Sequence, residues 1–213
     1  MSKVTALEPR RGTLRLFLDG KPALTVRREV AAQHGLCVGQ ELSDSDMDAL
    51  ARADRLYNCL MSAERFLAYR PHSESELRSK LARRYGRDTV DPIIARLKDQ
   101  GLVDDASFCE YWSHSRQTSN PRSQRLVRLE LRQKGVGTDL TQLVNSDDYE
   151  SAYRAAQSRI RHLTGDDKSR QRLADFLRRR GFSYEVVTRT IALITKERAG
   201  PALEKTTGRL IRG

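Results

Sequence analysis

The chain has 213 residues and carries 39 lysines and arginines against 28 aspartates and glutamates, a formal net charge of +11. Hydrophobic residues make up 38% and aromatic residues 6%, which favours thin helical layers with much solvated surface over one large core. The excess of cations points to an anionic partner, namely nucleic acid, an acidic protein surface or an anionic membrane. A membrane is the least favoured of these, because no apolar run approaches the roughly 18 residues that a span requires.

The N-terminus and the cysteines indicate a reducing compartment. Residues 1–11 carry charges and Pro9 and lack the apolar centre of a signal peptide. Cys37, Cys59 and Cys109 are odd in number and form no Cys-x-x-Cys pair. We therefore expect reduced, mostly buried thiols in a cytoplasmic protein.

Residues 1–45 are expected to form an N-terminal extension built on a β-hairpin. Two β-prone runs, 13–18 and 23–26, flank Asp19-Gly20, a sequence typical of a tight hairpin turn. A lone hairpin is marginally stable, so it should pack on a helix or on a partner.

A long helix is predicted to follow the extension. The sequence from Ser43 to Asp46 is rich in N-cap residues, and apolar positions continue at helical spacing as far as Tyr69. The helix should end at Arg70-Pro71, because the residue before a proline is disfavoured in the α region.

A pattern of serine, apolar residues four and eight positions on, and then a turn residue occurs three times. The copies are Ser73-Leu77-Leu81-Tyr85 (followed by Gly86), Ser123-Val127-Leu131-Gly135 and Ser169-Leu173-Leu177-Gly181. Each copy predicts a helix with a serine N-cap, a buried stripe and a glycine stop, and a second apolar helix follows each one. The middle and end of the chain are thus expected to repeat one small helical unit.

These patterns give predicted boundaries along the chain. They are 1–45 for the hairpin extension, 46–108 for the first helical repeat region, 109–150 for the second repeat, 151–199 for the third repeat and 200–213 for a flexible tail.

Basic residues gather on the predicted helices. The residue eleven positions after each serine is Arg84, Lys134 or Arg180, in the last helical turn. Such a cation either offsets the helix dipole or contacts an anionic partner, and both interpretations stay open.

A stripe of arginines is predicted in the second repeat. Arg125, Arg128 and Arg132 share one helix face, and Glu130 is the single acid near them. In the third repeat Asp175 is the single acid among five arginines. The shortage of acids favours phosphate or acidic side chains as counter-ions over a merely solvated face. The candidate partner- or DNA-binding residues are Arg70, Arg78, Lys80, Arg83, Arg84, Arg122, Arg125, Arg128, Arg132, Lys134, Arg170, Arg172, Arg178, Arg179 and Arg180.

No motif indicates catalysis, a cofactor or a metal. The four histidines lack metal-binding spacing, and there is no phosphate-binding glycine loop or nucleophile motif. The paired aspartates Asp104-Asp105 and Asp147-Asp148 precede apolar helices, where aspartate usually serves as an N-cap. We therefore expect a binding protein and not an enzyme.

Three stretches resemble the RecX family of bacterial recombinase regulators. They are residues 68–81 (AYRPHSESELRSKL), 97–108 (LKDQGLVDDASF) and 125–136 (RLVRLELRQKGV), within a similarity that extends over about residues 55–195. The resemblance implies a mainly α fold, an elongated and curved tandem array of three-helix repeats, to which some members add an N-terminal hairpin. It further implies a monomer that binds the RecA recombinase filament on single-stranded DNA. By the same resemblance, such binding is expected to limit the extension of the filament and to inhibit its ATPase, strand-exchange and co-protease activities in DNA repair and the SOS response.

Two alternatives remain open at this stage. One is a helix-turn-helix module that binds DNA or RNA directly, although the repeats lack a clustered set of base-reading side chains. The other is a nucleic-acid-processing enzyme that uses the paired aspartates, which metal-dependent nuclease activity would reveal.

Overall fold

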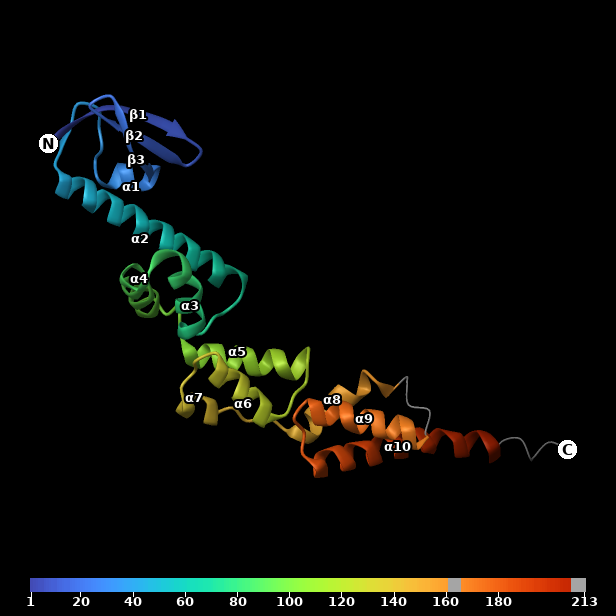
Figure 1. The fold of residues 1–213 in the computed structure, drawn as a ribbon. Coiled ribbons are helices and arrows are strands. Elements are labelled where there is room, and N and C mark those ends of the chain that lie inside the picture. Colours follow the sequence, from blue (N-terminus) through green and yellow to red (C-terminus); the bar gives the residue numbers. More distant parts are fainter. Residues whose placement is uncertain (161–165, 208–213) are drawn as a thin grey trace. The chain divides into compact units, whose positions relative to one another are not determined.

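A computed structural model describes residues 1–160 and 166–207 of the chain, with side chains up to residue 197. The chain divides into two compact units, Met1–Val103 and Asp104–Gly213. The first unit contains a small sheet and three-helix packing, and the second is helical (Figure 1). No helix among the described residues is long and apolar enough to cross a membrane.

The N-terminal sheet has four antiparallel strands. They are β1 (Ser2–Arg10), β2 (Thr13–Leu18), β3 (Lys21–Arg27) and β4 (Glu41–Leu42), in the order β3-β2-β1-β4. The predicted hairpin around Asp19-Gly20 is confirmed as β2 and β3, but the prediction of a simple hairpin is wrong. Strand β1 was missed because it holds charges and Pro9, and only Val4 of this strand is fully buried.

The sheet packs on helices, as a small sheet must to bury one face. Helix α1 (Arg28–Gln33) and the first half of α2 (Asp44–Tyr69) cover it. Their shared core consists of Val4, Leu16, Val26, Val30, Ala31, Leu42 and Leu50.

Helix α2 begins and ends where the sequence predicted. The Ser43 hydroxyl accepts from the Asp46 N–H at 3.2 Å, and the Asp46 carboxylate accepts from the Ser43 N–H at 2.8 Å, which completes a capping box. The second half of α2 packs against α3 (Glu74–Tyr85) and α4 (Arg87–Asp99) to form the first group of three helices.

The second unit contains two further groups of three helices. The first of them is α5 (Asp105–Thr118), α6 (Gln124–Gln133) and α7 (Thr138–Gln142), and the next is α8 (Asp148–Gln157), α9 (Asp167–Arg179) and α10 (Tyr184–Thr207). Leu131 and Leu177, from the repeated pattern, are both 0% exposed. The mainly α fold with three helical groups is confirmed, while the residue boundaries drawn from the sequence stay predictions.

Two of the three serine caps are confirmed, and the third prediction is wrong. Ser73 and Ser123 accept from the backbone N–H groups three residues on, at 3.1 and 3.2 Å. In the third group Asp166 is the N-cap and accepts from the Ser169 N–H at 3.1 Å, so α9 begins one turn earlier than predicted. Aspartate and serine are equally good N-cap residues, so the sequence Asp-Asp-Lys-Ser allows a helix that starts after Asp166 or after Ser169.

The C-terminal segment also differs from the prediction. Helix α10 continues past Gly200-Pro201 to Thr207, because a proline removes one helical hydrogen bond without always ending the helix. Residues 208–213, the rest of the predicted tail, lie outside the described residues.

The three cysteines are free thiols, and two of them are buried. Burial raises the pKa of the Cys59 thiol to about 11 and also raises the pKa of Cys109. Both groups therefore act as small apolar side chains of their cores.

Candidate nucleic-acid and protein interface

The predicted binding residues divide into cations that the fold itself uses and cations that face solvent. In the first helical group Arg70 forms an ion pair with Glu76 at 2.6 Å, across the α2–α3 turn. Arg78 pairs with Glu74 at 2.8 Å and also with Asp91. These two arginines fasten α3 to its neighbours, so they contribute little free charge to a partner.

The Lys80 side chain is held by a contact with a buried histidine. His72 is 3% exposed, and its ring nitrogens contact the Arg70 carbonyl oxygen at 2.8 Å and Lys80 Nζ at 3.0 Å. Burial lowers the pKa of His72, so the ring is neutral at physiological pH and its free nitrogen can accept from the lysine. The Lys80 ammonium also lies 4.9 Å from the centre of the Phe66 ring, which places it against the protein.

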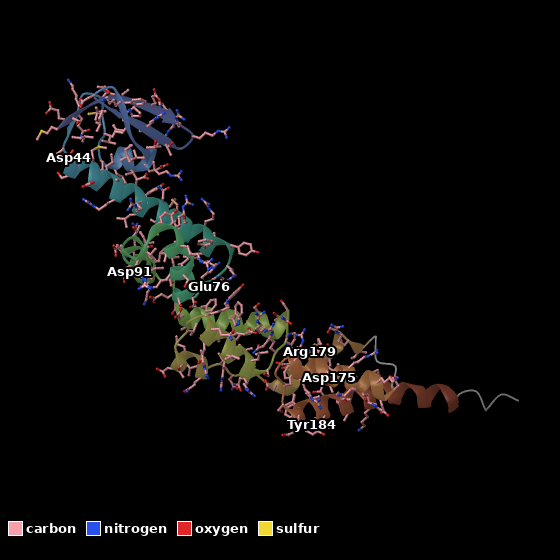
Figure 2. All side chains as sticks on the ribbon, in the orientation of Figure 1. Asp44, Glu76, Asp91, Asp175, Arg179 and Tyr184 are labelled. Atoms are coloured by element: carbon pink, nitrogen blue, oxygen red, sulfur yellow. The ribbon has the colours of Figure 1, made fainter. Side chains whose placement is uncertain are left out.

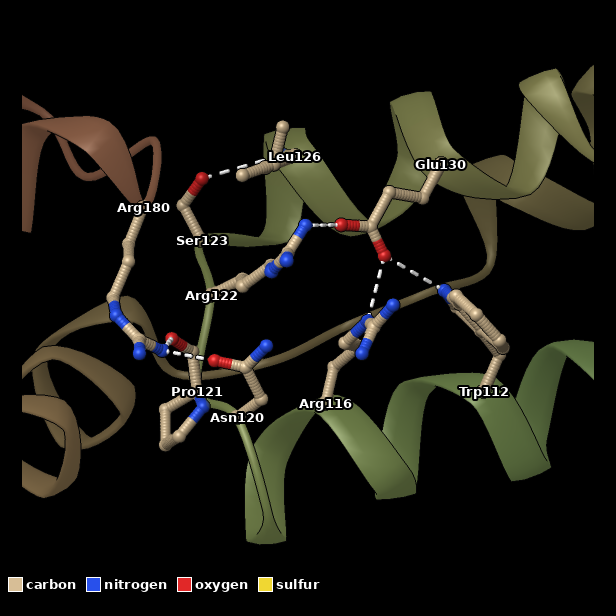
Figure 3. Close-up of polar contacts among 9 residues, drawn as sticks. All are labelled: Trp112, Arg116, Asn120, Pro121, Arg122, Ser123, Leu126, Glu130 and Arg180. Atoms are coloured by element: carbon tan, nitrogen blue, oxygen red, sulfur yellow. Dashed lines mark hydrogen bonds and ion pairs between the residues drawn. The ribbon is translucent and has the colours of Figure 1, made fainter.

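A single carboxylate organises the second helical group. Glu130 on α6 has a side chain only 11% exposed and accepts from Trp112 Nε1 at 2.9 Å and from Arg116 Nε at 2.7 Å (Figure 3). It also pairs with Arg122. Arg122 is thus part of the α5–α6 packing, and Arg116 is a residue that the sequence analysis missed.

One carboxylate does not neutralise two guanidinium groups. Burial lowers the pKa of Arg116 and of Arg122, and the charge of Arg116 lowers that of Arg122 further. Lys134 adds a third cation, with its ammonium 4.2 Å from the centre of the Trp112 ring. The network is therefore held together by directed hydrogen bonds and ring contacts, and its two arginines and one glutamate carry a net positive charge.

The three arginines of the predicted stripe on α6 differ in their contacts, because one is bound within the fold and two face solvent. Arg128 donates to the carbonyl oxygens of Gln142 and Val144 at 3.0 and 2.9 Å, so it caps the end of α7. Arg125 and Arg132 are exposed and make no hydrogen bond or ion pair within the described part of the chain.

Arg180 joins the second and third helical groups. It donates to the Pro121 carbonyl oxygen at 2.8 Å and to Asn120, and its guanidinium lies 4.5 Å from the centre of the Phe176 ring (Figure 3). The turn that follows it touches α6, because a Cβ added at Gly181 would lie 2.5 Å from Ser123 Oγ. The last-turn cation of α9 therefore has a structural role.

Helix α9 carries cations that face solvent. Arg170 pairs with Asp167, which is 96% exposed, and Arg178 lies 3.5 Å from Asp175. Figure 2 labels Arg179 beside Asp175 on this helix. Across residues 1–160 and 166–197, the exposed candidates without a hydrogen bond or ion pair are Arg83, Arg84, Arg125, Arg132, Arg172 and Arg179.

The paired aspartates cap helices. Asp104 accepts from the N–H groups of Ala106 and Ser107 at 3.1 and 3.0 Å, and Asp147 accepts from that of Tyr149 at 2.8 Å. The described residues bring together no group of three or more side chains that could hold a metal ion.

Family models and relatives agree with this architecture. Models of the first, second and third three-helix domains of RecX match residues 59–97, 104–142 and 146–191, which together are more than half of the chain. This chain belongs to the RecX family. The three matched segments correspond to α2–α4, α5–α7 and α8–α10.

Relatives named regulatory protein RecX cover most of the chain. The protein of Chlorobium phaeobacteroides is 36% identical over 61% of this chain and 88% of its own length, and that of Bacillus subtilis is 27% identical over 92% and 78%. A crystal structure of regulatory protein RecX has a TM-score of 0.60 and 26% identity, and covers 87% of this chain and 97% of its own. The RecX of Lactobacillus salivarius shares the fold, with a TM-score of 0.55, 21% identity and coverage of 67% and 97%. The RecX family consists of regulatory proteins and not enzymes, in agreement with the sequence prediction.

Proposed function

We propose that this RecX family member binds the RecA filament on single-stranded DNA and inhibits filament extension, ATPase activity, strand exchange and co-protease activity. Family membership supports a regulatory role directed at RecA. The free buried thiols favour action in the cytoplasm, and each helical group has its own core, which suits a monomer.

The observation that carries the proposal is the placement of the unpaired arginines. Among the candidate residues, those without a hydrogen bond or ion pair in the described part of the chain lie on the second helix of every helical group: Arg83 and Arg84 on α3, Arg125 and Arg132 on α6, and Arg172 and Arg179 on α9. A repeated helix that presents cations suits a partner whose negative charge also repeats, as phosphates and acidic side chains do along a nucleoprotein filament. The contacts would recognise charge and not base sequence.

A pull-down at matched salt tests the proposal. The protein should be retained by RecA filaments on single-stranded DNA more strongly than by bare single-stranded DNA, and it should lower the ATPase rate of the filament. Affinity for DNA alone should fall steeply with salt and vary little with base sequence. A strong preference for one duplex sequence would instead support the helix-turn-helix alternative.

A charge-reversal variant locates the binding surface. We expect Arg125→Glu with Arg132→Glu to reduce ATPase inhibition at least tenfold, because repulsion replaces attraction on α6. Folding should survive, since exposed substitutions of this kind usually change stability by within about 0.5 kcal/mol each. The matched control is Arg96→Glu with Lys196→Glu, which reverses two exposed cations on α4 and α10 that make no hydrogen bond or ion pair among the described residues, and it should inhibit like the parent. Full inhibition by the α6 variant at physiological salt would place the binding surface elsewhere.

A further inference from the structure

A hollow of about 620 Å³ lies in the first unit, where the sheet meets the first helical group. Its walls come from β3, α2 and the α3–α4 turn, and its lining residues include Leu24, Asp54, Arg55, Arg84 and Tyr85. This volume falls in the range of sites that hold a small organic ligand, and it exceeds what a single carboxylate would fill. The repeated pattern named Arg84 as a candidate binding residue but did not indicate a hollow, because the walls come from three separate segments of the chain.

Two arginines at the hollow make no hydrogen bond or ion pair within the described part of the chain. They are Arg55 on α2 and Arg84 on α3, and both are exposed. The Arg84 guanidinium lies 5.4 Å from the centre of the Tyr85 ring, and this contact orients it. Two guanidinium groups from different helices that line one hollow and have no ion pair among the described residues favour an anion between them.

The one carboxylate of the lining is already engaged. Asp54 accepts from the Arg27 backbone N–H at 2.6 Å and from Asn58 Nδ2 at 2.8 Å. Arg27 in turn donates through Nε to Asn58 Oδ1 at 2.8 Å, which places a third guanidinium behind this wall. Asp54 is thus held by a backbone donor and an amide donor, and it forms no ion pair with Arg55 or Arg84.

The backbone brings helix ends of both signs to the hollow, because Gly86 is the C-cap of α3 and also the N-cap of α4. Helix α4 begins at Arg87, directly after the lining residue Gly86, and no side chain caps its first N–H groups. The terminus of this 13-residue helix carries a partial positive charge, of which the exposed Asp88 offsets a part.

From these features we infer that the hollow binds a phosphodiester of single-stranded DNA, with Arg55 and Arg84 as the groups that contact the phosphate. The inference rests on the proposed function for the identity of the nucleic acid. The hollow has room for a nucleotide, and Leu24, Ala51 and the Tyr85 ring supply apolar surface for its sugar or base. The N-terminal sheet would thus act as one wall of a DNA contact.

The test measures binding of the full chain to a fluorescein-labelled oligothymidylate by anisotropy over a series of salt concentrations. We expect Arg55→Gln with Arg84→Gln to weaken binding at least fivefold and to make the slope of log K against log salt shallower by about 0.7 for each lost phosphate contact. The matched control is Arg52→Gln with Arg65→Gln, which removes two exposed cations from α2 outside the hollow. The control should lose less than twofold.

Each other outcome is decisive. Equal losses in the two double variants would show a general charge effect and overturn the inference, as would a parent protein that does not bind the oligonucleotide at low salt. Unchanged DNA binding with lost inhibition of RecA would assign the hollow to an acidic protein side chain, which overturns the inference and leaves the proposed function standing. A parent protein that binds DNA but does not inhibit RecA would refute the proposed function alone.

Discussion

Helices α6 and α9 share an apolar pattern but use their arginines differently. Each helix buries a leucine of the repeated pattern completely, Leu131 in α6 and Leu177 in α9. Around α6, Arg122 and Arg128 are bound within the fold. On α9, Arg170 and Arg178 pair with exposed acids, and among the described arginines of this helix only Arg180, at the C-cap, is bound within the fold.

The difference arises from where the acid lies. Glu130 is nearly buried and faces α5, so it binds cations from two segments. Asp175 is 44% exposed, and its partners Gln171 and Arg178 both lie on its own helix. An exposed i,i+3 pair has a free energy of about 0–0.5 kcal/mol, too little to hold a cation away from a partner. The availability of an arginine therefore depends on the burial of neighbouring acids and not on how many there are.

The largest effect should be equal in the two helices. Leu131→Ala and Leu177→Ala should each lower the free energy of unfolding by about 2–5 kcal/mol, because both side chains fill cores and leave cavities. Urea denaturation of the two variants measures this. If the urea midpoint of either variant were unchanged, the two leucines would not play the same role in their cores.

A second contrast concerns the turn after α9. Gly181 has φ of +86° and touches α6, while Gly101, with φ of +69°, has no atom within 4 Å of an added Cβ. We expect Gly181→Ala to cost about 2–4 kcal/mol, from backbone strain plus overpacking. Gly101→Ala should cost about 1–2 kcal/mol from strain alone. Similar losses by thermal denaturation would show that the contact with Ser123 does not constrain the turn.

The next largest effect on stability should come from replacing the acidic residues, and it should differ between Glu130 and Asp175. Glu130→Gln leaves Arg116 and Arg122 without a counter-ion in a partly buried site and should cost about 2–3 kcal/mol, below the range for a fully buried pair because both arginines keep some solvent. Asp175→Asn should cost less than about 0.5 kcal/mol. Chemical denaturation at low and high salt measures both, and a larger loss for Asp175→Asn would reverse the comparison.

The smallest expected effect depends on pH. Burial raises the pKa of the Asp148 carboxyl, which accepts from the Gln124 N–H at 2.7 Å at the start of α6. The folded state then binds more protons than the unfolded state between the ordinary aspartate pKa and the raised one, so stability should fall as pH rises through that interval. Asp148→Asn should flatten the profile of unfolding free energy against pH there. A profile as steep as that of the parent would assign the slope to other groups.

The sequence predicted most of the helices because their evidence is local. The N-caps at Ser43, Ser73 and Asp104 and the apolar stripes depend on residues within two turns of one another. Strand β1 and the two-residue β4 could not be predicted, since their pairing joins residues 2 and 3 to residues 42 and 41.

The candidate site was less predictable for the same reason. The exposed pair on α6 could be named from its spacing, but the capture of Arg122 by Glu130 and of Arg128 by the α7 carbonyl groups depends on how helices pack. Arg116 could have been named from the sequence, because it lies four residues after Trp112 in a predicted helix. In the structure its guanidinium lies 4.2 Å from the centre of the Trp112 ring. Arg55 carried no such local indication.

The junction at Arg180 has a consequence for the order in which the chain folds. The Ser123 N–H, at the start of α6, donates to the Arg180 carbonyl oxygen, and Arg180 and Pro121 are 59 residues apart. At synthesis rates of about 5–20 residues per second, α6 emerges roughly 3–12 s before its acceptor exists. Until then the second helical group has an unfinished edge, so the nascent chain completes its second and third groups together rather than one after the other.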